Sequence, residues 1–262
     1  MIIDLHNHTK LCNHATGEIE QYIQAAIKNK TKFYGISDHA PMDYDEKYRM
    51  SFSQMDFYEK MVLECKQKFS DQIDILLGYE IDYLNGHMHE CLFKRKVDYL
   101  IGSVHFLNDW GFDNPEFIGE YKNRDIDDIW REYFMAEIAL AKSGKFDIVG
   151  HFDLIKIFNF MPKTDIKILA KEALKAIKKA NMVVEINAAG LRKPIKEQYP
   201  SREILELVFE MGIPITFGSD AHSPSQVGQN SDICVNLARS IGFSEAVCFK
   251  NRDRFNVKFN LL

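Results

Sequence analysis

The chain lacks several features that would place it in other classes of protein. Its apolar runs are far shorter than the ~20 residues that a membrane-spanning helix needs. Only three apolar residues precede Asp4, whereas a secretory signal peptide has about 7–15. No linker rich in Pro, Gly or Ser, no low-complexity tract and no repeat interrupts the 262 residues. We therefore expect one domain spanning residues 1–262 in a cytoplasmic protein that binds no membrane.

Clusters of cationic residues are also missing. The formal net charge is −5 and Lys and Glu are interspersed, whereas sequence-independent binding to nucleic acid requires clustered cations. The five cysteines are odd in number and form no CxxC pair, which is typical of free thiols in a reducing compartment. We expect no nucleic-acid partner, and the sequence leaves the oligomeric state open.

Helical patterns alternate with short apolar runs along the chain. From Glu18 to Lys30, apolar residues recur at the spacing of one buried helical stripe, and the segments 52–69, 126–142, 166–180 and 202–211 are similar. Seven short apolar runs lie between these segments, near Ile2, Ile36, Leu76, Ile101, Ile148, Val184 and Ile215. Repeated β-α units predict a parallel α/β sheet that either closes into a barrel or stays open.

Potential metal ligands follow these apolar runs. Seven of the nine histidines, together with one Glu and one Asp, lie in segments that each resemble the end of a strand or the loop after it: His6, His8, His14, His39, Glu80, His105, His151, Asp220 and His222. A single His beside a strand is more often an ordinary hydrogen-bonded residue. Nine such groups at equivalent positions instead indicate a metal centre, because neutral imidazole and carboxylate suit Zn, Mn and Fe.

The positions of these residues decide between an open sheet and a barrel. The C-terminal ends of all the strands of a barrel converge on one mouth, whereas an open sheet would spread seven contributions along an edge. We therefore predict a seven-stranded barrel resembling a TIM barrel but one strand short.

Spacing within the motifs also carries information. His6 and His8 are two residues apart, as are Asp220 and His222, so each pair can face the same side of an extended segment. The carboxylate of Glu80 can bridge two cations, which an imidazole nitrogen cannot, so several adjacent cations are expected. His87 and His89 have the same spacing but fall in a segment whose pattern predicts the start of a helix, where such residues do not face one another. We interpret them as surface histidines.

Taken together, the motifs resemble those of the polymerase and histidinol phosphatase (PHP) family, and they occur in the family's order. They are DLHNH from residue 4, SDH from 37, GYE from 78, GSVH from 102, GHFD from 150 and GSDAH from 218. Within the family, the chain is most similar to the histidinol-phosphate phosphatases. This similarity lies in its length, its Cys12-Asn13-His14-Ala15 loop and its Asn187 to Arg192 segment.

The resemblance implies a distorted seven-stranded (β/α)7 barrel of the PHP type that holds three divalent transition-metal ions (Zn, Mn or Fe). The implied ligands are His6, His8, Glu80 and Asp220 for the first ion, Glu80, His105 and His151 for the second, and His14, His39 and His222 for the third. Arg192 matches a cationic phosphate contact of the family, and Lys156 stands where an Arg is expected. A Lys neutralises phosphate as a point charge but lacks the planar fork of Arg. Cys12 could also reach a metal, but the histidines suffice without it.

The chemistry expected from such a site is hydrolysis of a phosphate monoester. Cations neutralise the phosphoryl oxygens and deprotonate water near neutral pH, so a hydroxide bridging the first two ions is the expected nucleophile. Arg192 and Lys156 would stabilise the developing charge. Asp220, His222 or a metal-bound water could protonate the leaving oxygen. Ligating histidines usually need a hydrogen-bonding partner, a role expected for Asp4 and Asp38, and for Asp153 with His151.

The substrate implied by the resemblance is L-histidinol phosphate, a small-molecule ester whose hydrolysis to L-histidinol and phosphate belongs to histidine biosynthesis. A pocket for its ammonium and imidazole should offer acidic and aromatic groups. The candidates are Asp43, Tyr44, Asp45, Tyr48, Trp110, Phe112, Asp113 and Glu116. Two alternatives stay open at this point: a PHP phosphoesterase acting on nucleoside phosphates or short nucleotides, and a non-catalytic metal-binding module.

Overall fold

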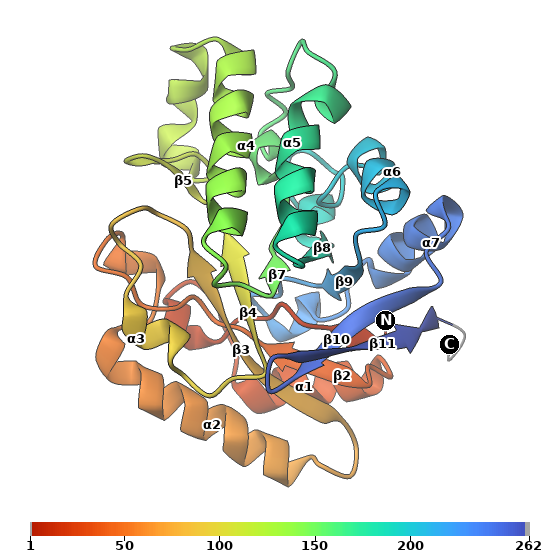
Figure 1. Cartoon of the computed structure of the whole chain (residues 1–262). Helices are drawn as coiled ribbons and strands as arrows, with labels where there is room; N and C mark the ends of the chain where they lie inside the picture. The colour runs from red at the N-terminus through yellow and green to blue at the C-terminus, as the bar shows by residue number, and fades with distance from the viewer. Residues whose placement is uncertain (1, 260–262) are drawn as a thin grey trace.

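A seven-stranded parallel sheet forms the centre of the structure, a computed structural model that describes residues 2–259 (Figure 1). Its strands follow one another in chain order: β1 (Ile3–Asp4), β2 (Phe33–Ile36), β3 (Asp74–Asp82), β4 (Tyr99–Ser103), β7 (Ile148–Val149), β8 (Val183–Asn187) and β9 (Ile215–Gly218). All neighbouring pairs are parallel. Each of the seven apolar runs predicted from the sequence contributes one strand.

The segments that follow the first and last strands complete the circle. Leu5 N donates to Phe217 O at 2.9 Å, Asp220 N donates to His6 O at 2.7 Å and His8 N donates to Ala221 O at 3.0 Å. These bonds bring β1 beside β9, so the sheet curves into a nearly closed barrel. The predicted seven-stranded barrel is confirmed. It is distorted, because β1 and β7 are only two residues long.

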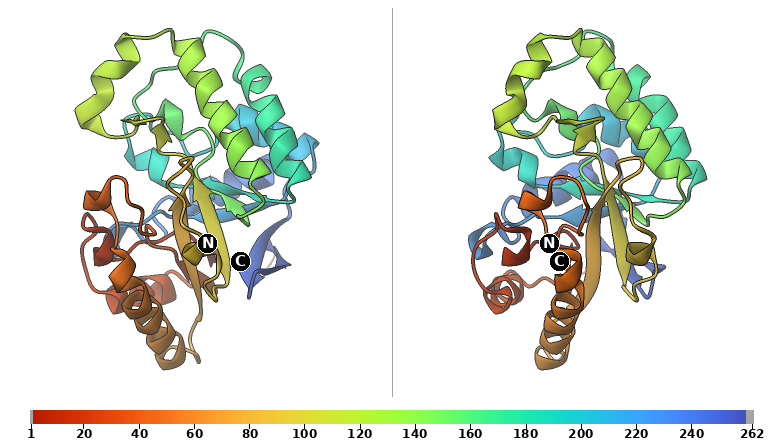
Figure 2. Two further views of the ribbon diagram at one scale, coloured as in Figure 1. Left: turned by 60° about the vertical axis from the view of Figure 1, so that its left-hand side comes forward. Right: turned by 90° about the vertical axis from the view of Figure 1, so that its left-hand side faces the viewer.

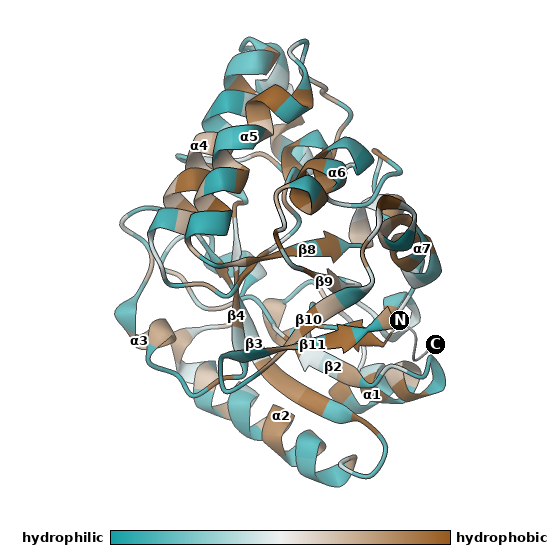
Figure 3. Ribbon diagram, turned by 45° about the vertical axis from the view of Figure 1, so that its right-hand side comes forward, coloured by the Kyte–Doolittle hydropathy of each residue, from teal (hydrophilic) through white to brown (hydrophobic). Residues whose placement is uncertain are grey.

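The larger helices cover the outside of the barrel. Those predicted from the sequence are observed as α1 (Ile19–Lys28), α2 (Met55–Lys68), α4 (Ile126–Lys142), α5 (Ile166–Lys179) and α6 (Arg202–Glu210), and the sequence patterns did not reveal α3 (Glu90–Phe93) or α7 (Ser231–Ile241). The α2 helix begins later than predicted because residues Phe52–Gln54 form a 3-10 turn, η3. Capping side chains fix some of the starts: Asp125 accepts from Asp127 N and Asp165 from Lys167 N. Figure 3 shows hydrophilic and hydrophobic residues on each large helix, whereas β8 and β9 are largely hydrophobic.

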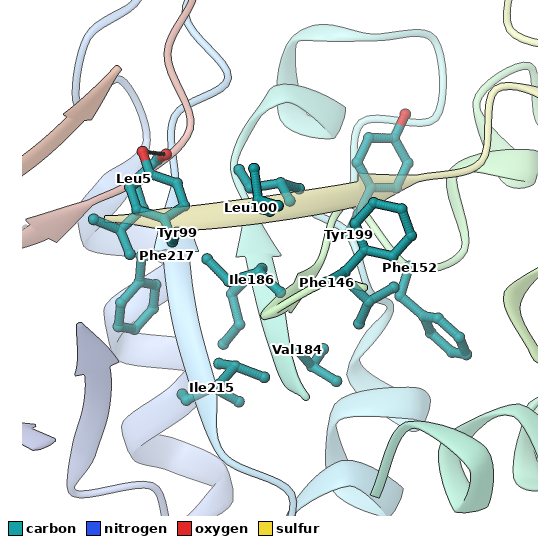
Figure 4. Close-up of a cluster of buried hydrophobic side chains, with 14 of the residues drawn as sticks. Leu5, Tyr99, Leu100, Phe146, Phe152, Val184, Ile186, Tyr199, Ile215 and Phe217 are labelled. Carbon is teal, nitrogen blue, oxygen red and sulfur yellow. Dashed lines mark hydrogen bonds between the residues drawn. The ribbon is translucent and has the colours of Figure 1, made fainter. Parts of the chain in front are cut away.

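Apolar side chains from several strands fill the interior. Leu100, Ile186, Ile215 and Phe217 belong to a cluster of buried residues (Figure 4). Tyr99 crosses this core, and its hydroxyl donates to Leu5 O at 2.5 Å. A Cβ at Gly35 would lie 2.0 Å from that hydroxyl oxygen, so the close approach of β2 to Tyr99 requires glycine.

Additional segments surround the barrel. Beyond β4, a hairpin of β5 (Phe106–Leu107) and β6 (Trp110–Gly111) leads to a 3-10 helix, η4 (Pro115–Lys122), and then to α4. In Figure 2 these residues arch from the end of β4 to the start of α4. Shorter 3-10 turns are η1 (Lys10–Cys12), η2 (Glu46–Tyr48), η5 (Leu154–Lys156), η6 (Ala189–Arg192) and η7 (Pro224–Gln226), and a C-terminal hairpin pairs β10 (Glu245–Lys250) with β11 (Asp253–Lys258). Within residues 2–259, no helix combines the length and apolar character needed to cross a bilayer.

Candidate metal centre and active-site cavity

The nine predicted ligands converge at one end of the barrel, around Glu80. They form overlapping groups in which one potential ligand atom from each residue lies within 4.8 Å of those of the others: His14, His39 and His222; Glu80, His105 and His151; His6, His8 and Glu80; and His6, His151 and Asp220. A further group joins His8 and His222 to Cys12. Glu80 lies within β3, His14 lies in the loop after η1, and the others lie in the segments that follow β1, β2, β4, β7 and β9. The extension of β2 beside β3 places His39 next to Glu80, since Ala40 N donates to Glu80 O at 2.8 Å.

The two carboxylate oxygens of Glu80 face different histidines. Its Oε2 lies 3.0 Å from His39 Nδ1 and 3.3 Å from His6 Nε2. Its Oε1 lies 2.9 Å from His151 Nε2 and 3.7 Å from His105 Nε2. Ser103 Oγ donates to Oε1 at 2.6 Å and holds the carboxylate in place. This geometry is the one that a bridge between two ions requires.

Five of the histidine rings have a partner on Nδ1, on the side away from the centre. Such partners fix the ring orientation and the tautomer. The pairs are His6 with Glu185 (2.8 Å), His8 with Asp38 (3.3 Å), His105 with Asp82, His14 with Cys12 O (2.8 Å) and His222 with Asp220 O (3.2 Å). In each of these rings Nε2 is left to face the other ligands.

The predicted hydrogen-bonding partners are only partly confirmed. Asp38 does contact His8, but the prediction for Asp4 was wrong, because Asp4 accepts from the backbone N and hydroxyl of Ser219 at 2.8 and 2.5 Å. The prediction for Asp153 was also wrong, because its carboxylate accepts from Ser201 N and pairs with Lys156 instead of His151.

Sequence reasoning missed Glu185 and Asp82 as histidine partners, although both left a signal in the sequence. Glu185 is a charged residue inside an apolar strand. Asp82 follows Glu80 by two residues and therefore faces the same side of β3.

Burial and charge fit the cluster for metal binding. His6 Nε2, Glu80 Oε2 and His222 Nε2 are buried and have no hydrogen-bond partner among the described residues, an unfavourable state that a bound cation would relieve. Burial lowers the pKa of His39 and of His222 well below the ordinary value, so both rings are neutral and can coordinate. This set of imidazole and carboxylate donors suits divalent transition metals.

Neighbouring groups also shift the pKa values of Glu80 and His8. Burial would raise the pKa of Glu80, but His6 and His39 outweigh it and hold that pKa well below its usual range. Burial would lower the pKa of His8, but hydrogen bonds to Asp220 and Asp38 raise it to about 9. A metal ion must therefore displace a proton from His8 at neutral pH, so metal binding is stronger at higher pH. Cys12 is a poor ligand, since its thiol donates to Thr9 O and burial raises its pKa.

A cavity of about 490 Å³ opens above the ligands. Its floor includes seven of the nine: His14, His39, Glu80, His105, His151, Asp220 and His222. His6 and His8 are fully buried beneath it. Arg192 lies on the wall, where its Nη2 donates to Ser219 O and Asp220 O at 2.7 and 3.0 Å. Its buried Nη1 has no partner among the described residues, so one donor is available to a ligand.

The structure does not bring Lys156 to this cavity. Lys156 is 0% exposed, and its ammonium donates to Glu197 at 2.7 Å and Gln198 O at 2.8 Å and lies 3.0 Å from Asp153. A buried ammonium needs such partners, and they hold it behind the wall. The predicted direct contact between Lys156 and phosphate therefore has no support in the geometry.

Three of the eight loop residues proposed for substrate recognition line the cavity: Asp45, Tyr48 and Asp113. Asp43, Tyr44, Trp110, Phe112 and Glu116 do not. Phe117 on η4 also lines it and was missed, because nothing in the sequence predicted how η4 turns. His87 and His89 are exposed beside Asp43, as expected of surface histidines.

A nearly closed α/β barrel with clustered imidazole and carboxylate ligands beneath a cavity defines a metal-binding barrel protein. A family model described as the PHP domain matches residues 4–189, and a PHP-associated model matches residues 200–230. The chain belongs to the PHP family.

Similar proteins are named as phosphatases. A "Probable histidinol-phosphatase" of Deinococcus radiodurans is 38% identical over 96% of this chain and 97% of its own length. Another, from Schizosaccharomyces pombe, is 31% identical over 88% of this chain and 83% of its own length. The solved histidinol phosphate phosphatase of Lactococcus lactis, in complex with zinc, L-histidinol and phosphate, has the same fold. The TM-score is 0.79 at 19% identity, and the match covers 97% of this chain and 98% of that one.

Proposed function

We propose that this chain is a phosphoric monoester hydrolase that converts L-histidinol phosphate to L-histidinol and phosphate with three divalent transition-metal ions. The observation that carries the proposal is the cavity itself, because one concave site combines the complete ligand cluster with the free Nη1 of Arg192. The 38% identity to a histidinol-phosphatase over nearly the whole chain supports the substrate.

The ligand sets proposed are those implied by the sequence motifs. His6, His8, Glu80 and Asp220 would hold the first ion; Glu80, His105 and His151 the second; and His14, His39 and His222 the third. When bound, such ions neutralise phosphoryl oxygens and generate a hydroxide nucleophile near neutral pH.

The protein's own residues position the substrate. Arg192, held by two carbonyls, directs Nη1 at a phosphoryl oxygen and makes a charge-assisted hydrogen bond there. Asp220 and His222 lie on the floor, and either of them, or a water bound there, is proposed to pass a proton to the leaving oxygen.

Recognition of the rest of the substrate is assigned to the cavity's outer part. Asp45 and Asp113 offer negative charge to the ammonium of histidinol phosphate, and Tyr48 and Phe117 offer aromatic surface to its imidazole. The Lactococcus lactis protein has been crystallised with L-histidinol and phosphate, which is consistent with a pocket of this chemistry in the family.

The test is initial-rate profiling against a panel of phosphate monoesters, with Zn, Mn and Fe supplied separately. Histidinol phosphate should have the highest kcat/KM, and Asp113→Asn should lower it by roughly tenfold while sparing p-nitrophenyl phosphate, which has no ammonium. The gene should also restore growth without histidine to a strain lacking this phosphatase. A clear preference for a nucleoside monophosphate would instead favour the nucleotide alternative.

A further inference from the structure

Tyr199 is a wall residue that the sequence did not single out. It follows β8, and its backbone pairs with the end of that strand: Asn187 N donates to Tyr199 O at 2.7 Å and Tyr199 N donates to Asn187 O at 3.0 Å. The residue is 1% exposed, and it packs among buried apolar side chains. In Figure 4 its hydroxyl points away from the labelled apolar side chains. The ring is therefore fixed by its surroundings and lines the cavity.

The hydroxyl of Tyr199 has no hydrogen-bond partner among the described residues. Leaving a buried hydroxyl unpaired is unfavourable. Tyr34 also carries a buried, unpaired hydroxyl, but Tyr34 does not line the cavity. Tyr199 thus differs from Tyr34 in one respect that matters here: its side chain borders the cavity in which a ligand would bind.

Lys156 packs behind this tyrosine. Its Nζ lies 5.4 Å from the centre of the Tyr199 ring and donates to the carbonyl of Gln198, the preceding residue. The sequence led us to expect Lys156 at the phosphate. Instead, Lys156 packs against the ring of Tyr199, and Tyr199 lines the cavity.

The neighbours of Tyr199 indicate which ligand its hydroxyl would meet. Arg192 comes from the same segment after β8, lines the same cavity and also has an unpaired donor. On the floor, His151 is the near neighbour, with ring centroids 6.4 Å apart at 78°. A phenol is protonated at neutral pH, so the hydroxyl can donate. Two unpaired donors beside a metal-ligand cluster match the oxygens of a phosphate group.

We propose that Tyr199 is a further catalytic residue, whose hydroxyl donates a hydrogen bond to a phosphoryl oxygen of the bound ester beside Arg192. The inference rests on the proposed function for its reaction, but phosphate binding tests it independently of turnover.

The experiment compares Tyr199→Phe with Tyr34→Phe in the metal-loaded full-length protein. Each variant removes one unpaired buried hydroxyl, so neither should lose thermal stability or metal content. Tyr199→Phe should lower kcat/KM by roughly 10–100-fold for both histidinol phosphate and p-nitrophenyl phosphate, the effect of losing a donor to a charged acceptor. It should also weaken binding of inorganic phosphate, measured by calorimetry. Tyr34→Phe should leave all of these values unchanged.

Two results would overturn the proposal. One is a Tyr199→Phe variant with normal kcat/KM and normal phosphate affinity. The other is a loss confined to histidinol phosphate, which would assign the hydroxyl to the leaving group. If the wild-type protein hydrolysed no phosphate monoester but Tyr199→Phe still weakened phosphate binding, the proposed function would fail while the phosphate contact stood.

Discussion

The floor and the outer wall of the cavity hold their side chains in different ways. On the floor, Glu80 is 1% exposed and its carboxylate lies within 4.0 Å of five histidines, and five of the seven predicted histidine ligands have a partner on Nδ1. On the wall, Phe117 is 47% exposed and the Asp45 side chain is 30% exposed. The floor is therefore organised before any ligand arrives, whereas the wall can adjust to the organic part of a substrate. We therefore expect reaction type and substrate choice to depend on separate regions of one cavity.

The largest effect should come from breaking the floor at Glu80. Glu80→Gln removes the charge that the two oxygens share among five histidines, so it should disturb two sites at once. We expect metal content to fall by more than one ion per chain from close to three, and activity to fall at least about 1000-fold, beyond the 10–100-fold typical of outer partners. Elemental analysis and initial rates measure both. Glu64→Gln, on an exposed face of α2, is the control, and fully active protein holding at most one ion would contradict the trinuclear centre.

The next largest effect should come from Arg192, which lies on the cavity wall close to the floor. Arg192→Ala removes the unpaired donor at the cavity and should lower kcat/KM for any phosphate monoester by about 2–4 kcal/mol. Metal content should not change, because Arg192 contacts carbonyl groups and no ligand side chain. A variant with near-normal kcat/KM would show that Arg192 has a structural role and that phosphate is bound elsewhere.

A smaller loss should follow from weakening the floor indirectly. Glu185 accepts from His6 Nδ1 and from His151 N, both at 2.8 Å, and contacts no ion site itself. Glu185→Gln should weaken metal affinity by roughly 10–100-fold. Activity should return when excess metal is supplied, as metal titrations would show. Activity that stays low at saturating metal would mean that Glu185 acts on the reaction directly.

The smallest effect should be on stability, and it comes from Glu137, a buried carboxyl that belongs to neither the floor nor the outer wall of the cavity. Glu137 on α4 is 0% exposed and has no histidine ligand bonded to it, and burial raises its pKa to about 8. Between the ordinary value of 4.5 and about 8, the folded state binds a proton that the unfolded state has lost. The free energy of unfolding therefore decreases as pH rises through this window.

Replacing this carboxyl with an amide should remove that pH dependence. Above pH 8, Glu137→Gln should have a Tm a few degrees higher than that of the wild type. Each kcal/mol gained in the free energy of unfolding raises Tm by roughly 2–4 °C. The two proteins should be similar near pH 4.5, where the wild-type carboxyl is protonated in the folded state. Equal Tm differences at both pH values would show that Glu137 does not titrate in this window.

The same contrast explains what the sequence could predict. Most of the predicted floor ligands lie at or just beyond the C-terminal ends of apolar strands, so their convergence at one barrel mouth could be deduced from their positions along the sequence. The wall could not be deduced in this way. Tyr199 reaches the cavity through its pairing with Asn187, and Phe117 through the turn of η4, and neither contact leaves a periodic pattern.

Lys156 shows a second limit of sequence reasoning. Its place in the family motif predicted a phosphate contact. One of its partners, Asp153, lies three residues before it, but another, Glu197, lies 41 residues further along the chain, and that pairing leaves no local signal in the sequence. Long-range pairing of a charged side chain was therefore the feature that the sequence did not reveal.

The seam between β1 and β9 has a consequence for folding kinetics. The Nε2 of His8 lies 3.1 Å from Asp220 across a sequence separation of 212 residues. Closing a chain loop of that length costs on the order of 5 kcal/mol in entropy. Since these contacts join segments more than 200 residues apart in sequence, the seam should form late. An ion bound by His8 and Asp220 would cross-link the two ends of the barrel, so a chelator should accelerate amide hydrogen exchange at the seam before it affects the strands opposite.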